Sequence, residues 1–215
     1  MLRLTQIQEV VEVCRRVATN GLNNGVNAYI PPLEIDVLKP PCDFLGAVGN
    51  PAIFVNEHTH KLLGGIHETW IANRTIAIKD SFLNLNNMEI IGAIVHETGH
   101  AFNVAANIEN SEANAYIFEI EVLLKLHELG TLQTFGCFRT DIKVFFQSRF
   151  DFYRIDMADK PYLAGLVKAL QNEEFNQTLS NKEPIFSQIR PYCFFQRPSL
   201  RENTSSLEEA SYLHN

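Results

Sequence analysis

Apolar residues recur with a helical period near the start of the chain. A helix over residues 5–19 is predicted by Ile7, Val10, Val11, Val13 and Val17. The following NGLNNG suits a helix end, and the prolines of the next segment exclude a long helix. Within that segment, LEIDVL alternates between apolar and polar positions as a strand does. The chain is therefore predicted to begin with a helix followed by extended structure.

Three short segments with high β-propensity follow, at residues 52–56, 66–72 and 75–80. The last two are separated only by Asn73 and Arg74, a length that fits a tight hairpin. The pattern predicts a small, mainly antiparallel sheet.

Helical spacing returns from Met88 onward, and Asn86 followed by Glu89 resembles a capping box at the start of this helix. Two asparagines then interrupt the pattern. Ser111 can cap a second long helix, which Gly130 ends. The sequence thus predicts two helices joined by a short loop.

Residues 141–153 and 161–175 also have helical spacing, whereas 201–215 is polar and predicted to be a flexible tail. The 215 residues are 46% hydrophobic, which is sufficient for one sizeable core. We predict an α+β fold in a single domain over residues 1–200, with a helical carboxy-terminal part.

Composition excludes several classes of partner. The formal charge is −7 and the basic residues are scattered, which argues against a nucleic-acid surface. No segment approaches the ~20 apolar residues of a membrane span. The amino terminus lacks the apolar run of a secretory signal, and the cysteines form no CxxC pair (Cys14, Cys42, Cys137 and Cys193). We expect a protein made in the cytoplasm with free thiols, without membrane insertion, and monomeric by default.

The segment GAIVHETGHAFNVAA, residues 92–106, carries the clearest chemistry. His96 and His100 lie four positions apart in a predicted helix, so both imidazoles can bind one metal ion, with Glu97 beside them. Zn²⁺ in catalytic sites takes three protein ligands and a water, and a neighbouring carboxylate can accept a proton from that water. Chance can also produce this spacing, but the apolar flanks and the small Gly99 favour a zinc site.

The segment VHETGHAFN resembles the active-site helix of the zincin metallopeptidases. The metzincin branch would need glycine at 103 and histidine at 106, where this chain has Asn103 and Ala106. SEANAYIFE is similar to the [N/S]-E-x-x-A pattern of the gluzincin branch, with Glu112 in the ligand position and Ala115 allowing close helix approach. The resemblance implies a zincin-like fold, zinc-dependent hydrolysis of peptide bonds, and Glu97 as general base.

Two glutamates compete as third ligand. If the first helix runs on to Ala106, it rises about 1.5 Å per residue beyond His100. An antiparallel helix that returns from there reaches the height of His100 only near Glu119, which would favour Glu119 as ligand. A helix that ends soon after His100, as Asn103 permits, brings Glu112 opposite the histidines. We expect Glu112 to be the ligand and Glu119 to be a carboxylate on the same helix face that contacts a ligand without binding the metal. Glu119 is the alternative ligand.

The resemblance also implies a substrate strand and a transition-state donor. In the family, the strand before the active-site helix pairs with extended substrate, and here the matching segment is TIAIKD. The donor is usually a tyrosine or histidine from a later segment. The sequence leaves five candidates open, namely Tyr116, His127, Tyr153, Tyr162 and Tyr192.

Other features are weaker. His58 and His60 would face the same way on a strand, but nothing completes a second metal site, so we expect them and His67 to be surface or loop residues. Cys42 faintly resembles a latency cysteine and is interpreted as an ordinary thiol. The tail SLEEASYLHN resembles the translocation signals of type IV-secreted bacterial effectors, although a disordered tail that carries no signal fits equally well.

Three functions follow from these features. The first is a bacterial effector peptidase that is translocated into a host cell and cuts a host cytoplasmic protein. The second is an intracellular regulatory peptidase that cleaves a repressor-type protein. The third is a non-catalytic, peptidase-like binding module, against which Glu97 argues because such a module needs no base beside the metal.

Overall fold

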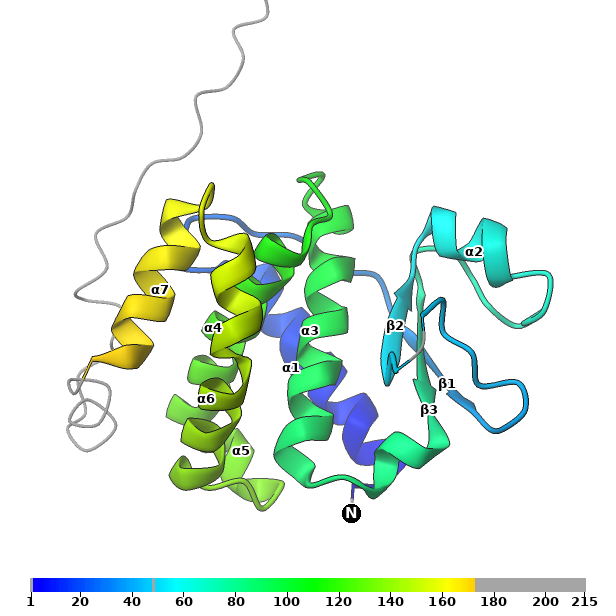
Figure 1. Cartoon of the computed structure of the whole chain (residues 1–215), viewed down its shortest axis with the longest axis horizontal. Helices are drawn as coiled ribbons and strands as arrows, with labels where there is room; N and C mark the ends of the chain where they lie inside the picture. Colours follow the sequence, from blue (N-terminus) through cyan, green and yellow to red (C-terminus); the bar gives the residue numbers. More distant parts are fainter. Residues whose placement is uncertain (1, 48, 173–215) are drawn as a thin grey trace, which may run out of the picture.

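The computed structural model describes residues 2–47 and 49–172. These residues form seven α-helices, one short 3-10 helix and a three-stranded sheet, which confirms the mixed α+β class. The helix α3 (Asn87–Ala105) lies between the sheet on one side and α4, α6 and α7 on the other (Figure 1). The predicted domain end at residue 200 and the tail 201–215 lie outside the described residues.

The predicted long helices form. They are α1 (Leu4–Asn20), α3, α4 (Glu112–Glu128), α6 (Arg139–Asp156) and α7 (Pro161–Gln171), with the short α5 (Thr131–Thr134) after α4. The Asn86 half of the predicted capping box is present, because the Asn86 side chain accepts a hydrogen bond from the backbone N–H of Glu89 at 2.9 Å. Ser111 occupies the N-cap position of α4, but its side chain makes no capping bond. None of the helices described is long and apolar enough to span a bilayer.

The sheet is mixed, so the prediction of a mainly antiparallel sheet is wrong. Its strands are β1 (Glu34–Leu38), β2 (Ala52–Val55) and β3 (Thr75–Lys79), in the order β1-β3-β2. Strand β3 pairs in parallel with β1 and antiparallel with β2. The chain returns to insert β3 between two earlier strands, and this crossover determines the parallel pairing.

Segment 66–72 is not a strand, and the predicted hairpin is absent. The short helix α2 (Glu57–Leu63) follows β2, and the chain then passes through turns, where Trp70 N–H bonds to the His67 carbonyl. The Trp70 ring is buried behind the sheet, and its Nε1 donates to Asp36 Oδ2 at 2.9 Å. The apolar residues of this segment therefore fill a small core instead of forming a strand face.

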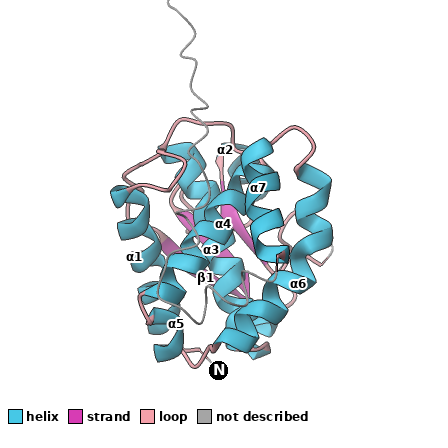
Figure 2. Cartoon of the chain, turned by 90° about the vertical axis from the view of Figure 1, so that its left-hand side faces the viewer, coloured by secondary structure: helices cyan, strands magenta, loops and turns pink. Residues whose placement is uncertain are grey.

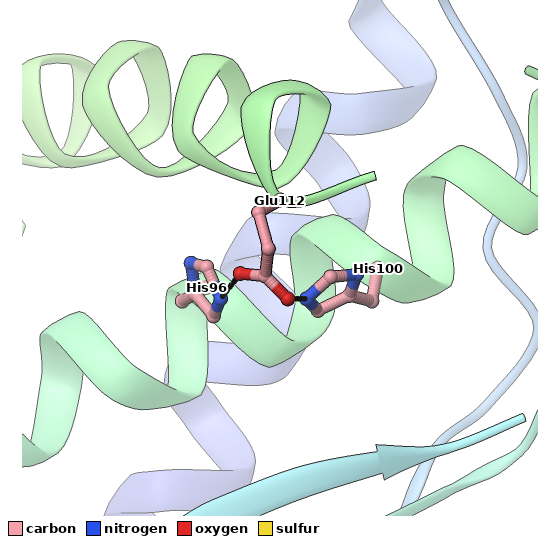
Figure 3. Close-up of side chains that lie close together, drawn as sticks. All are labelled: His96, His100 and Glu112. Carbon is pink, nitrogen blue, oxygen red and sulfur yellow. Dashed lines mark ion pairs between the residues drawn. The ribbon is translucent and has the colours of Figure 1, made fainter. Parts of the chain in front are cut away.

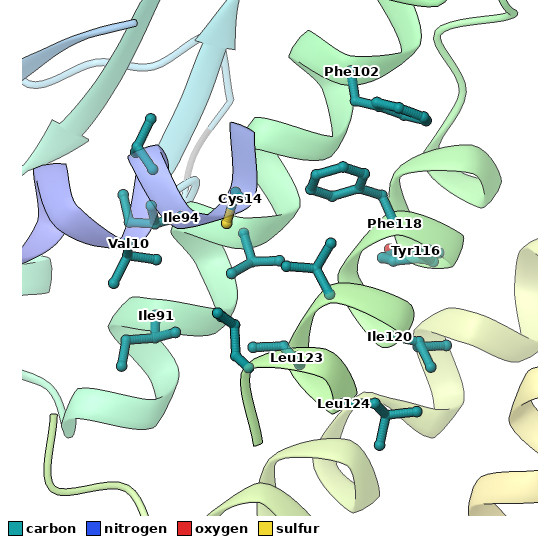
Figure 4. Packing of buried hydrophobic residues seen from close by; sticks show 14 of the residues in the cluster. Val10, Cys14, Ile91, Ile94, Phe102, Tyr116, Phe118, Ile120, Leu123 and Leu124 are labelled. Carbon is teal, nitrogen blue, oxygen red and sulfur yellow. The ribbon is translucent and has the colours of Figure 1, made fainter. Parts of the chain in front are cut away.

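The two faces of the sheet pack against different clusters. One face adds Phe54, Ile76 and Ile78 to the large core shared with the helices, and the other adds Val55 and Ala77 to the small cluster around α2. Figure 2 shows the sheet behind α3 and α4. Residues of α1, α3 and α4 interlock in the large core, among them Val10, Cys14, Ile91, Ile94 and Leu123 (Figure 4). This packing on all sides fixes α3.

Candidate metal centre

His96 and His100 lie on consecutive turns of α3, on one face, as the spacing predicts. Their ring centroids are 5.0 Å apart with the rings nearly perpendicular. The two side chains are buried to a similar degree, with 11% of His96 and 13% of His100 exposed. Because the rest of α3 is embedded in the core, the two imidazoles are presented from a rigid element.

Glu112, in the first turn of α4, completes a three-residue cluster. Its Oε2 lies 3.1 Å from His96 Nε2, and its Oε1 lies 3.4 Å from His100 Nε2 (Figure 3). One ligand atom from each residue lies within 4.8 Å of the others, close enough to bind a metal ion. The Glu112 side chain is 55% exposed, so the cluster opens to solvent. Two imidazole nitrogens and one carboxylate form a donor set that suits Zn²⁺ and leaves a coordination position open.

The path of the loop explains why Glu112 reaches this position. α3 continues to Ala105, the geometry for which we expected Glu119 opposite the histidines, yet the carboxylate that lies against the Nε2 atoms of both histidines is that of Glu112. After Asn107, whose φ is 52°, the chain turns back along the helix, and Ile108 N–H bonds to the Asn103 carbonyl at 3.0 Å. The loop thus retraces the last helical turn, and α4 begins near the level of His100.

The two helices approach closely beside the site. A Cβ atom added at Gly99 would lie 3.1 Å from the Ala115 carbonyl oxygen and 3.2 Å from Ala115 Cα. The expected role of Ala115 in close helix approach agrees with this geometry. Small residues at both positions allow the first turn of α4 to reach the histidines.

Each imidazole also has an acceptor oxygen close to its other nitrogen. His96 Nδ1 lies 2.9 Å from Glu119 Oε2, and His100 Nδ1 lies 2.8 Å from Asn110 Oδ1. Both neighbours are acceptors, which favours a proton on Nδ1, so that a bound cation would take the place of the proton on Nε2, on the side toward Glu112. Ring orientation and tautomer therefore both fit metal binding.

The electrostatics of the cluster favour a cation. Burial lowers the pKa of His96, but contacts with Glu112 and Glu119 outweigh it and raise that pKa to about 10. Contacts with His100 and His96 hold the pKa of Glu112 well below its usual range. Without a metal, the carboxylates thus favour a proton on the imidazoles, and a divalent cation can replace that positive charge.

Glu97 is fixed by the sheet. Its Oε2 accepts a hydrogen bond from the backbone N–H of Phe54 in β2 at 2.6 Å. β2 is an edge strand, whereas β3 is central and bonded on both sides, so TIAIKD cannot take an added strand and that expectation is wrong. Sequence reasoning missed Phe54 because 43 residues separate it from Glu97 and no local pattern connects them.

One candidate donor lies beside the cluster. The Tyr116 ring centroid is 5.1 Å from that of His96. Two other tyrosine hydroxyls are engaged elsewhere, because Tyr153 donates to Glu119 and Tyr162 donates to Glu121. His127 lies near the opposite end of α4 from Glu112, next to Gln133, and Tyr192 lies outside the described residues.

The weaker sequence features form no second site in the part of the chain described. His58 and His60 lie on α2 and not on a strand, and His67 stacks on Trp70 with ring centroids 4.2 Å apart. Cys42 is exposed. Among the described residues, His96, His100 and Glu112 are the one group of histidine, cysteine and acidic side chains placed to hold a metal.

Comparisons with protein-family models, curated proteins and solved structures found no match to this chain. The fold alone does not define a function, so the functional argument depends on the chemistry of this cluster.

Proposed function

We propose that this chain is a zinc-dependent endopeptidase with a zincin-like active site of the gluzincin type. One observation carries the proposal: His96, His100 and Glu112 converge at one point, and Glu97 directly follows His96 in α3. A closed structural zinc site would use four protein ligands and would need no additional carboxylate. Three ligands with an adjacent base are the arrangement of a hydrolytic site.

The residues then have distinct roles. Zn²⁺ bound by His96, His100 and Glu112 would polarise the substrate carbonyl and acidify water. Glu97 accepts the proton of the attacking water and returns it to the leaving amine. The Phe54 N–H holds the Glu97 carboxylate in place during both transfers. Tyr116 is the candidate donor to the developing oxyanion.

The edge of β2 supports an extended protein substrate. Val55 and Pro51 direct their carbonyls toward the chain around β3, where Asn73 N–H and Lys79 N–H bond to them at 2.7 and 2.9 Å. In an antiparallel pair the backbone groups of the intervening residues point the other way, as the Phe54 N–H does toward Glu97. Because Glu97 already occupies the Phe54 N–H, an extended peptide would add along the rest of this edge and present a peptide bond to Glu97.

The decisive comparison is the wild type against Glu97→Gln. Both are purified with zinc and without chelator, and their metal content is measured by elemental analysis. We expect one zinc per chain in both proteins. Cleavage of lysate proteins, detected as new amino termini, should fall by about 10²-fold or more in Glu97→Gln, the usual contribution of a general base.

A matched control is Glu89→Gln, an exposed glutamate in the first turn of the same helix. It should cleave like the wild type. Zinc-free wild type that added metal does not activate, or undiminished cleavage by Glu97→Gln, would contradict the proposal.

Substrate origin separates the remaining functions. A translocated effector should cut a protein found in host-cell lysate, whereas a regulatory peptidase should cut one in lysate of the producing cell. A binding module should retain zinc and cut neither. The new amino termini would then identify the substrate, and a single cleavage position would show that the enzyme is specific.

A further inference from the structure

We propose that Arg149 of α6 is a positioning residue for the metal centre: together with Tyr153 it fixes Glu119, and Glu119 in turn fixes the His96 ring with Nε2 toward Glu112. The inference rests on the proposed metal site and extends it to a helix without metal ligands. Glu119 and Arg149 are 30 positions apart in the sequence.

The contacts around Glu119 form a continuous chain to the metal cluster. Arg149 Nη2 donates to Glu119 Oε2 at 2.9 Å, and Arg149 Nε lies 2.9 Å from Oε1. Tyr153 donates its hydroxyl to Oε1 at 2.6 Å. Oε2 is also the atom that lies 2.9 Å from His96 Nδ1. Both carboxylate oxygens are thus held from α6, while one of them faces the imidazole.

Burial makes the guanidinium necessary. The Glu119 side chain is 0% exposed, and an ionised carboxylate without a cation in such a place is costly. Arg149 contacts both oxygens, through a hydrogen bond from Nη2 to Oε2 and an ion-pair contact of Nε with Oε1, so it constrains the orientation of the carboxylate as well as its charge. Lysine would supply the charge at one point only.

Arg149 is itself held in one orientation. Its Cζ lies between 5.4 and 5.9 Å from the ring centroids of Tyr116, Phe145, Phe152 and Tyr153. Aromatic faces attract a guanidinium and restrict its movement. The enclosure therefore transmits the rigidity of α6 through Arg149 and Glu119 to His96, whereas His100 has only the Asn110 amide of a loop.

The test measures metal binding and not cleavage. Metal-free protein is titrated with Zn²⁺ against a chromophoric chelator, and Co²⁺ is then added as a spectroscopic probe of ligand geometry. Arg149→Met should weaken zinc binding by about 10–100-fold, the usual cost of losing an outer partner of a metal ligand, and should change the visible Co²⁺ spectrum. Arg149→Lys should recover only part of the affinity.

Arg154→Met is the matched control, because Arg154 lies on the same helix, is 59% exposed and pairs only with Asp151 in its own helix. It should bind both metals like the wild type. Thermal unfolding of each metal-free variant shows whether it is folded. If Arg149→Met does not fold, Tyr153→Phe is used in its place, because this substitution removes one hydrogen bond to Glu119 and keeps the aromatic ring. We expect Tyr153→Phe to lose less zinc affinity than Arg149→Met and to show the same change in the Co²⁺ spectrum.

A folded Arg149→Met (or Tyr153→Phe) protein with wild-type zinc affinity and Co²⁺ spectrum would overturn the inference, even if its thermal stability is reduced. Glu112→Ala separates this failure from that of the proposed function. If Glu112→Ala loses zinc while Arg149→Met does not, the metal site stands and the role of Arg149 falls. If the wild type binds neither ion, both fall.

Discussion

Two buried glutamates of α4, only two positions apart, lie in opposite surroundings. Glu119 is 0% exposed and Glu121 is 2% exposed. Burial raises the pKa of Glu119, but His96 and Arg149 outweigh it, so that pKa is lowered. Burial also raises the pKa of Glu121, and there it dominates, because the neighbours are uncharged. These neighbours are the backbone N–H of Asn23 at 2.6 Å and the Tyr162 hydroxyl at 2.6 Å.

The contrast distinguishes a carboxylate that serves a site from one that joins parts of the fold. Residues i and i+2 project from nearly opposite sides of a helix. Glu119 faces the metal cluster, where a cation keeps it ionised and able to orient an imidazole. Glu121 faces away and links α4 to the loop after α1 and to α7. Equal burial therefore does not mean an equal role, and the charge of the partners decides.

The largest expected effect is at Glu112, the first glutamate of α4 and the proposed metal ligand. Glu112→Ala should lower zinc affinity by more than about 100-fold, the upper range for residues that only support a ligand, because it removes a ligand itself. Competition with a chromophoric chelator measures the loss. Glu109→Ala is the control, since Glu109 is 70% exposed and pairs with Lys160 away from the cluster. A larger loss in Glu119→Ala than in Glu112→Ala would make Glu119 the ligand.

Matched substitutions of the two buried glutamates test whether only Glu119 acts on the metal centre. Glu119→Gln should weaken zinc binding by about 10–100-fold, because the neutral amide orients the His96 ring less firmly. Glu121→Gln should leave zinc affinity unchanged in the same titration. Equal losses in both variants would show that buried charge in α4 acts through general stability and not through His96.

A smaller effect is expected on the other side of the cluster. Asn110→Ala removes the partner of His100 Nδ1, but Asn110 itself is exposed, so water can take the place of the amide oxygen. We expect a loss of zinc affinity of less than about 10-fold, below the usual range for a buried outer partner. A loss exceeding that of Glu119→Gln would reverse the ranking of the two supports.

Local patterns predicted the parts of this molecule that local interactions decide. The histidine pair follows from the helical period, the start of α3 follows from the Asn86 cap, and the position of Glu112 follows from a short motif. The two sheet predictions that are wrong depend on non-local interactions. Residues 66–72 have high β-propensity, but Trp70 finds a buried position behind the sheet, and the pairing of β3 depends on a crossover that no short window contains.

The supporting contacts of the site were the hardest to predict. Phe54 contributes a backbone N–H, which no side-chain pattern reveals. Arg149 had one signal, a charge inside the aromatic run VFFQSRFDFY, but its partner Glu119 lies in another helix. Glu121 had none, because a glutamate on a helix is normally exposed. Such contacts form only when separate elements meet, so they depend on the tertiary fold.

The smallest expected effect concerns the pH dependence of stability at Glu121. Its raised pKa means that the folded chain keeps the proton at pH values where the unfolded chain has already released it. Stability should therefore fall as pH rises above the usual carboxyl pKa, and Glu121→Gln, which does not titrate, should avoid this loss. Below about pH 4 both states are protonated and the two proteins should respond alike to pH. Denaturant unfolding in the presence of chelator, at about pH 4 and about pH 7, measures the difference. If the wild type loses no stability relative to Glu121→Gln between these two pH values, the pKa of Glu121 is not raised in the folded chain.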